Sequence, residues 1–376
     1  MDPVELTQRL VRMDTINPPG NEMQCARLLQ ELLDTAGFET SLIPLGTDAQ
    51  RASLVARRGY AGGAAGNRPI AFTGHIDVVP LGTRRWTHPP FDAVVHDGRI
   101  HGRGTSDMKS GIAAFVCAAI AAPPEAELLL IITAGEETGC DGARVLAAGP
   151  HLGSAGALVV CEPTDNVVYV GHKGALWLRT VMEGKTAHGS MPEQGDNAIC
   201  KAVAAIDRIT PFDFCCDRHA VLGGPTLNVG TFHGGININS VPDRAVFELD
   251  IRTVPSMDHA TVRAALAAQM NERADIEVLV DLPAVWTDPQ TPWVRRVMDV
   301  ASRVTGHAAE IRTATYFSDA SLLGPALGHV PAIILGPGEP SMAHQTDEWC
   351  SISNIERATR IYGEMILDWM RCEQAV

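Results

Sequence analysis

Short apolar segments separated by helical stretches constrain the fold of this chain more than any other sequence feature. They cover residues 70–73, 128–133, 157–161 and 332–335. Strands that are apolar on both faces are typical of a parallel sheet whose two faces are covered by helices. We predict helices over 109–122, 142–148 and 292–304, and a final amphipathic helix over 355–370. The sequence therefore predicts an α/β fold with a mostly parallel sheet flanked by helices.

The section from about residue 174 to residue 284 departs from this pattern. It contains predicted strands over 176–182, 226–232, 245–252 and 276–281 and predicted helices over 195–208 and 258–272. This is an α+β arrangement, and α/β character returns after it. A length of 376 residues suits two domains. We therefore predict a discontinuous first domain, residues 1–173 and 287–376, interrupted by a second domain, residues 174–286.

Composition excludes several classes of protein. Apolar residues make up 45% and charged residues 20% of the chain, which is typical of a globular protein and excludes disordered and fibrous classes. The formal net charge of −14 repels nucleic acid and anionic membranes. The first residues lack the apolar core of a signal peptide, and no later stretch is apolar for long enough to span a bilayer. We expect a cytoplasmic protein that binds neither nucleic acid nor membranes.

Polar side chains follow the predicted strands at the points where the strands end. In chain order they are His75, Asp77, Glu136, Glu137, Glu162 and His344. The carboxyl ends of parallel strands meet at one edge of a sheet, where ligands bind, so we expect these side chains to lie close together. Asp107 lies in a turn bracketed by glycines, which we expect to direct its carboxylate towards the same edge.

These residues are typical of a metal site without thiolates. The nine cysteines are scattered with no C-x-x-C pair, whereas imidazole and carboxylate ligands suit zinc, manganese or cobalt. Several carboxylates with only two histidines indicate two metal ions that share one carboxylate, and Asp107 is the natural bridge. Asp77, two residues after His75, is expected to accept the other imidazole N–H. Of Glu136 and Glu137, one is expected to bind metal and the other to act as a base.

Seven motifs, in order along nearly the whole chain, resemble one enzyme family. They are GHIDVVP, GRGTSDMKSG, AGEETG, CEPT, GKTAHGSMPEQGDNAI, DIRTVP and GPG…AHQTDEW. The chain is similar to the co-catalytic metallohydrolases that include acetylornithine deacetylase, succinyl-diaminopimelate desuccinylase, aminoacylase and the glutamate carboxypeptidases. The resemblance implies an enzyme that hydrolyses amide bonds with two divalent metal ions, zinc in the first place and cobalt or manganese as alternatives.

The resemblance also implies how the metal ligands are divided. His75 and Glu162 would bind one metal ion. Glu137 and His344 would bind the other, and Asp107 would bridge the two. The first domain would therefore be the catalytic, dinuclear-metal domain.

Further roles follow from the same resemblance. Glu136 would be the general base that takes a proton from metal-bound water. The inserted domain would be a lid and the interface of a homodimer, and His188 would reach across the dimer to the scissile carbonyl. Arg252 and Asn239 would hold the substrate carboxylate and the lid side of the site, and Gly338 would lie in a substrate-binding loop.

Two sequence details bear on the substrate. Glu162 stands where dipeptidase and aminopeptidase relatives have Asp, which is similar to the deacylase and carboxypeptidase branches. The D-I-R-x-x-P form around Arg252 and the GPG…AHQTDE ending resemble acetylornithine deacetylase more than the desuccinylase. We therefore expect an amidohydrolase that cleaves an N-acyl amino acid, in the first place an N-acetyl one.

Other functions remain open at this point. A carboxypeptidase or dipeptidase of the same family, or succinyl-diaminopimelate desuccinylase, would carry the same metal ligands. A binding protein without catalytic activity is a further alternative, although it would not need Glu136. The sequence departs from the family pattern at His101, where relatives often have Tyr, and at residues 316–319, which replace a glycine-containing loop. We expect His88, His96 and His101 to be surface or structural residues.

Overall fold

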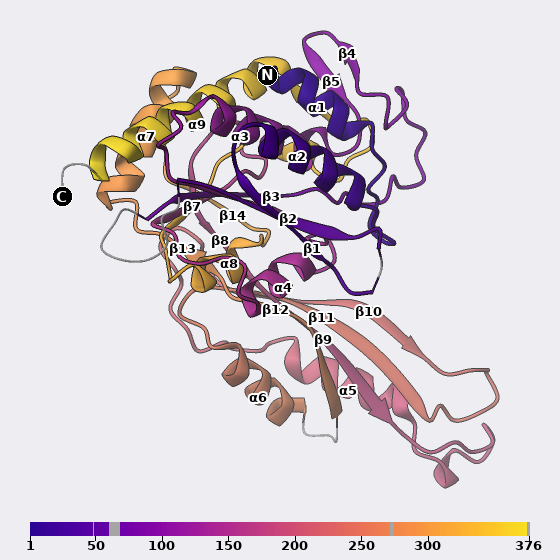
Figure 1. The fold of residues 1–376 in the computed structure, drawn as a ribbon. Coiled ribbons are helices and arrows are strands. Elements are labelled where there is room, and N and C mark those ends of the chain that lie inside the picture. Colours follow the sequence, from indigo (N-terminus) through magenta and orange to yellow (C-terminus); the bar gives the residue numbers. More distant parts are fainter. Residues whose placement is uncertain (48, 60–67, 271–273, 374–376) are drawn as a thin grey trace. The chain divides into compact units, whose positions relative to one another are not determined.

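The chain forms two compact units in a computed structural model that describes residues 1–47, 49–59, 68–270 and 274–373 (Figure 1). Unit 1 consists of Met1–Gly171, Trp286–Thr313 and Ser318–Val376. Unit 2 consists of His172–Val285 and Ala314–Phe317. The predicted α/β fold with an inserted α+β domain is confirmed.

Unit 1 is built around a sheet of nine strands, in the order β1-β2-β6-β3-β7-β15-β8-β13, with β14 paired to β8. Its strands are β1 (Glu39–Pro44), β2 (Ala52–Arg58), β3 (Ile70–His75), β6 (Leu128–Thr133), β7 (Ala157–Val160), β8 (Tyr169–His172), β13 (Val285–Trp286), β14 (Arg312–Ala314) and β15 (Ala332–Ile334). The central strands β6, β3, β7 and β15 are parallel, as predicted. The pairs β1-β2, β2-β6 and β15-β8 are antiparallel.

Helices cover both faces of this sheet, which explains why the central strands are apolar throughout (Figure 1). One face is covered by α1 (Pro3–Val11), α2 (Met23–Thr35), α3 (Ser110–Ala121), α7 (Pro292–Thr305) and α9 (Ile352–Glu373). The other face carries α4 (Asp141–Ala148) and α8 (Ala320–Ala326). The helix α3 is apolar on all sides and is buried from Ser110 to Ala119, as expected of a central helix.

Aromatic contacts fix the helices to the middle of the sheet. The ring centroid of Phe72 on β3 lies 6.1 Å from that of Phe115 on α3 and 5.5 Å from that of Tyr362 on α9. The Tyr362 hydroxyl donates a 2.6 Å hydrogen bond to the carbonyl of Leu335, which follows β15. A buried tyrosine with its hydroxyl paired contributes apolar contact area without leaving a polar atom unsatisfied. The strand ends that carry the candidate site are therefore held on a rigid core.

Unit 2 contains an antiparallel sheet of four strands in the order β10-β11-β9-β12. Its elements are β9 (Gly174–Glu183), α5 (Ala198–Ile209), β10 (Thr226–Gly234), β11 (Arg244–Thr253), α6 (His259–Met270) and β12 (Ala274–Leu282), with a short 3₁₀ turn at Pro192–Gln194. Buried and less buried residues alternate along β11, because α5 and α6 cover one face of the sheet. Residues 271–272 of the helix predicted over 258–272 lie outside the described residues.

The edge of this second sheet is apolar and exposed. In the part of the chain that the structure describes, the strand β10 pairs on one side only, with β11. Beyond it, the side chains of Ile236 and Ile238 are 86% and 102% exposed. An unpaired strand edge beside exposed isoleucines is a surface suited to association.

A third, small sheet of unit 1 was not predicted. It comprises β4 (Val94–His96), β5 (Arg99–His101) and β16 (Trp349–Ser351), each only three residues long. The turn between β4 and β5 is Asp97-Gly98, with φ angles of 48° and 70°. Positive φ at both positions is the type I′ hairpin turn that an Asp-Gly pair favours, so this dipeptide was a usable signal.

Two further properties of the described residues bear on the predictions. Eight cysteines, among them the buried Cys25, Cys117, Cys140, Cys161 and Cys350, are free thiols. No described helix combines the length and the apolar character needed to cross a bilayer.

Candidate metal centre

The predicted site residues of unit 1 follow neighbouring parallel strands. His75, the last residue of β3, lies opposite Thr133, the last residue of β6. On the other side of β3, Thr73 pairs with Val160 at the end of β7. The segments that carry Glu136, Glu137 and Glu162 therefore leave the sheet at the same edge as His75.

The first group at this edge is centred on His75. Its Nε2 lies 3.1 Å from Oδ1 of Asp107 and 3.6 Å from Oε1 of Glu162. The side chain of His75 is only 1% exposed. An imidazole nitrogen and two carboxylates thus face one another in the interior.

The second group is centred on His344, which comes from a loop far along the chain. Its Nε2 lies 3.4 Å from Oδ2 of Asp107 and 3.0 Å from Oε2 of Glu137. The side chain of His344 is 54% exposed, so this side of the cluster is open to solvent. Asp107 presents one oxygen to each histidine, which is the arrangement that a bridging carboxylate needs. The structure thus brings together all five residues predicted as metal ligands.

The turn that carries Asp107 is held by Glu348, which the sequence analysis did not assign. Glu348 is fully buried and forms an ion pair with Arg103, at 2.7 Å. Its carboxylate also accepts hydrogen bonds from the backbone N–H groups of Gly104, Ser106 and Asp107, at 3.0, 2.8 and 3.0 Å. A buried carboxylate with these partners fixes the position of the Asp107 backbone.

Asp77 lies beside His75, as predicted, and it does more than orient that ring. Nδ1 of His75 lies 3.0 Å from the Asp77 carbonyl and 3.5 Å from its carboxylate. This contact directs the Nδ1 proton to the carbonyl and leaves Nε2 free to bind a metal. The Asp77 carboxylate also accepts hydrogen bonds from the Asn17 amide, at 2.9 Å, and from the backbone N–H groups of Glu136 and Glu137, at 3.1 and 3.2 Å. It therefore holds both sides of the cluster.

Glu136 is buried next to the predicted ligands. Burial raises the pKa of its carboxyl group well above the usual value; His75 lowers it, and the charges of Glu162, Glu137 and Asp319 add to the rise. The Cys140 thiol lies 3.9 Å from its Oε1. The carboxylate is thus available for proton transfer.

Asp319 is a second buried carboxylate that the sequence analysis missed. Its Oδ2 accepts a 2.5 Å hydrogen bond from the Thr133 hydroxyl, and its Oδ1 has no partner among the described residues. In the sequence, segment 316–319 stands out only as a departure from the family pattern. Asp319 follows a short strand. A strand of that length shows no hydrophobic periodicity from which the packing of Asp319 could be predicted.

The electrostatics of the cluster favour bound cations. Burial, followed by the charge of Asp107, raises the pKa of Glu162 well above its usual value and also raises that of Glu137. Hydrogen bonds that its ring donates to the carboxylates of Asp107 and Glu137 raise the pKa of His344 to about 10. A buried surplus of carboxylates over imidazoles is costly unless positive charge compensates it. The donor set of imidazoles and carboxylates therefore fits divalent ions of the zinc, cobalt or manganese kind.

Three predicted site residues lie in unit 2, and two of them are neighbours. The backbone N–H of Gly189 donates a 2.7 Å hydrogen bond to the Asn239 carbonyl, and His188 pairs with Ser240. His188 is exposed, and its Nδ1 accepts a hydrogen bond from the Ser190 backbone N–H at 3.2 Å. In the neutral ring this leaves the proton on Nε2, which can then donate to an oxyanion.

The third is Arg252, for which the described residues of unit 2 show no hydrogen bond or ion pair to His188 or Asn239. Its guanidinium pairs with Asp250, at 2.9 Å, and lies 5.8 Å from the centre of the Phe317 ring. Its side chain is only partly exposed. A guanidinium that already pairs with one carboxylate can exchange it for the carboxylate of a substrate.

Gly338 lies against the turn that carries Asp107. A Cβ atom added there would be 2.2 Å from the Ser106 carbonyl oxygen, so no larger residue fits without movement. The glycine therefore has a packing role at the edge of the cluster.

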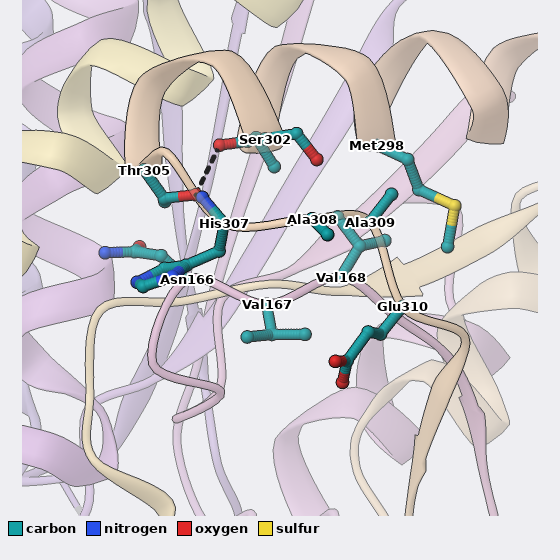
Figure 2. A pocket seen from close by; sticks show the side chains of 11 residues that line it. Asn166, Val167, Val168, Met298, Ser302, Thr305, His307, Ala308, Ala309 and Glu310 are labelled. Carbon is teal, nitrogen blue, oxygen red and sulfur yellow. Dashed lines mark hydrogen bonds between the residues drawn. The ribbon is translucent and has the colours of Figure 1, made fainter.

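Figure 2 shows a small cavity elsewhere in unit 1, between α7 and residues 166–168. Its volume is about 20 Å³, enough for one water molecule. None of the predicted site residues lines it. It is not a substrate pocket.

The sequence matches a known protein family over most of its length. Residues 71–368 match the model of peptidase family M20/M25/M40. A probable succinyl-diaminopimelate desuccinylase of Staphylococcus aureus is 30% identical, with 96% of this chain and 97% of that protein covered. Succinyl-diaminopimelate desuccinylase 2 of a Ruegeria species is 29% identical, with 99% and 96% covered.

Solved structures share the fold at lower sequence identity. An M20 family metallo-carboxypeptidase of Sulfolobus solfataricus has a TM-score of 0.82 at 19% identity, with 98% of this chain and 99% of that chain covered. A dinuclear metal-binding M20 peptidase of Bacillus subtilis has a TM-score of 0.67 at 15% identity, with 97% of each chain covered. These similarities support the two-domain architecture.

Proposed function

Because the chain belongs to peptidase family M20/M25/M40 and is thus a metal-dependent hydrolase of amide bonds, we propose that it removes a succinyl group from an N-succinyl amino acid. The gathering of His75, Asp107 and His344 at one sheet edge carries the hydrolytic part of this proposal. The succinyl group is supported by relatives named succinyl-diaminopimelate desuccinylase, which match over nearly the whole chain.

The comparisons thus favour the alternative over the N-acetyl substrate that the sequence motifs suggested. The D-I-R-x-x-P form around Arg252 and the GPG…AHQTDE ending support an acetylornithine deacetylase-like activity. We keep N-acetyl amino acids as the second candidate.

The proposed metal ligands are those that the geometry groups around each histidine. His75 and Glu162 would hold one divalent ion, Glu137 and His344 the other, and Asp107 both. We propose zinc, with cobalt or manganese as alternatives. When bound, such ions lower the pKa of water and polarise a carbonyl group.

We assign the proton transfers to Glu136. Its backbone N–H is fixed by Asp77, whereas its carboxylate forms no ion pair with His344 or His75 within hydrogen-bonding range in the described residues. It can accept a proton from the attacking water and deliver it to the leaving amine. The Asp77 contact fixes the backbone from which this carboxylate extends.

Unit 2 would supply the contacts to the substrate. The exposed Nε2–H of His188 is suited to stabilise an oxyanion. The planar guanidinium of Arg252 is suited to bind the free carboxylate of an N-acyl amino acid. The unpaired β10 edge with Ile236 and Ile238 supports a homodimer in which His188 acts on the partner's site.

A substrate panel tests the reaction. The zinc-loaded enzyme is assayed with N-succinyl, N-acetyl and N-formyl derivatives of the same amino acids and with dipeptides. The proposal expects the highest kcat/KM for a succinyl compound. A clear preference for acetyl compounds would support the second candidate, and a preference for dipeptides would contradict both.

Mixing two inactive variants tests the action of His188 in the dimer. Glu136→Gln and His188→Ala are unfolded, mixed in equal amounts and refolded. If His188 acts in trans, each mixed dimer has one intact site, and about one quarter of wild-type activity returns. If His188 acts within its own subunit, the mixture stays inactive.

A further inference from the structure

Three histidines of unit 1 gather on the small sheet, outside the candidate metal centre. We call His88, His96 and His101 the three-histidine cluster. The ring centroids of His88 and His101 are 4.8 Å apart, and that of His96 lies 5.9 and 6.3 Å from them. One ring nitrogen of each lies within 4.8 Å of the other two. From the sequence, we expect these residues to be only surface or structural ones.

The hairpin geometry explains why two of these rings share a face. Val94 pairs with His101, and His96 pairs with Arg99. Because every second residue of a strand points to the same side, His96 and His101 are diagonal neighbours on one face. The Arg99 guanidinium stacks on the Trp349 ring, 3.7 Å from its centre. The positive charge on this face is thus engaged with an aromatic ring.

A carboxylate lies beside the cluster on a different segment. Asp347 accepts hydrogen bonds from the backbone N–H and the hydroxyl of Thr87, at 2.6 and 2.9 Å. These bonds tie it to the residue next to His88. The Thr87 backbone N–H lowers the pKa of the Asp347 carboxyl, and the nearby His88 and His101 contribute to the same direction. Negative charge is thus maintained next to the imidazoles.

His101 has an unsatisfied nitrogen that points to a ligand. Its Nε2 is shielded from solvent and has no hydrogen-bond partner among the described residues. A buried polar atom without a partner is rare and is accounted for when an ion or water is bound there. Burial lowers the pKa of His101, which favours the neutral ring that metals bind.

We propose that the three-histidine cluster binds a divalent transition-metal ion of the zinc, nickel or copper class, separate from the ions of the candidate metal centre. Zinc–nitrogen bonds of about 2.0–2.1 Å hold tetrahedral ligands roughly 3.3 Å apart. The observed nitrogens, all within 4.8 Å, reach that spacing by small side-chain rotations. His96, whose side chain is 60% exposed, is free to make them.

Such an ion would join separate parts of unit 1. His88 precedes the hairpin, whereas His96 and His101 lie on its two strands, and β5 is paired to β16. Binding would therefore clamp the hairpin onto the loop before it. Since Gly102 directly follows His101, the clamp would also stabilise the start of the turn that leads to Asp107.

Zinc stoichiometry tests the proposal. The full chain and the His88→Ala/His96→Ala double variant are dialysed to equilibrium against buffered zinc, and bound zinc is measured by elemental analysis. The wild type is expected to bind one equivalent more than the double variant. His307→Ala, which removes an exposed histidine outside the cluster, is the matched control and should bind as much as the wild type.

A second pair of measurements keeps the test independent of the candidate metal centre and of folding. Glu137→Gln/His344→Ala should keep the additional equivalent, because it removes ligands only from the other site. If the double variant does not fold by circular dichroism, His96→Ala alone should weaken zinc binding by at least about tenfold. Equal zinc binding by the wild type and the folded cluster variant would overturn the proposal.

Discussion

The two units hold the side chains of the proposed site in different ways. In unit 1 the predicted ligands are packed at a sheet edge and fixed by further groups, among them Asp77 and Glu348. In unit 2 His188 and Asn239 are exposed, and Arg252 pairs with a neighbour on its own strand. Unit 1 is therefore pre-organised for chemistry, whereas unit 2 presents adaptable contacts.

This difference between the units explains how proteins of one fold can act on different substrates. Solved structures named carboxypeptidase and aminopeptidase match the chain with TM-scores of 0.82 and 0.75. A rigid metal centre can stay the same while exposed contacts change. Substitutions in unit 1 should thus affect the reaction or the fold, and substitutions in unit 2 should affect substrate binding.

The largest effect should come from Glu136→Gln. Removing a general base reduces kcat by roughly 10²–10⁴. Zinc binding should remain, because Glu136 is not among the grouped ligands. Rate measurements together with bound-zinc analysis check this, and Gln194→Ala on an exposed turn of unit 2 is the control. Retained turnover in Glu136→Gln would remove Glu136 from this role.

The next effect should come from Glu348→Ala, which tests the support of the Asp107 turn. The change leaves Arg103 buried without its partner, and breaking a buried ion pair costs about 3–5 kcal/mol. Urea unfolding measures the loss. Glu364→Ala, which removes the partner of two exposed arginines on the surface of the same unit, should cause a much smaller change. Equal losses would mean that Glu348 gives the turn no special support.

A smaller effect is expected for Asp77→Asn, which weakens the hold on His75. Loss of a group that orients a metal-bound histidine reduces metal affinity by about 10–100-fold. Competition with a zinc chelator measures this affinity. Asp250→Asn in unit 2 removes a carboxylate that pairs with Arg252 and Trp177, so it should leave zinc affinity unchanged. An equal loss in both variants would contradict the distinction between the units.

The smallest effect should come from Arg252→Ala. A hydrogen bond to a charged group contributes about 1.5–3 kcal/mol, and the existing Asp250 partner reduces the net gain, so KM should rise by about tenfold. The kcat value should change little, because the substrate carboxylate is bound equally in the ground and transition states. Arg179→Ala, on the exposed face of the same sheet, is the control. A fall in kcat with unchanged KM would place Arg252 in the chemistry instead.

The sequence predicted the parts of unit 1 that have a strong local signal. The central strands were apparent because they are buried on both faces, and His75, Glu137 and Glu162 follow them directly. His344 lies well beyond the last strand, and the family resemblance, rather than strand position, assigned it. The structure brings it to Asp107.

Residues that act through long-range packing could not be predicted in this way. Glu348 reaches the Asp107 turn across 241 residues, and Asn17 reaches Asp77 across 60. The sequence around a carboxylate or an amide in a loop has the same pattern whether the side chain is exposed or buried. The three-histidine cluster was missed for a different reason, because its strands are too short for periodicity and only the Asp97-Gly98 turn marked them.

The discontinuity of unit 1 has a consequence for how the protein is made. His344 and Glu348 leave the ribosome only after the whole of unit 2 has been synthesised. A nascent chain therefore has neither the second histidine nor the anchor of the Asp107 turn until translation is almost complete. The complete set of proposed metal ligands is therefore present only in a nearly finished chain. A product of interrupted translation would be inactive.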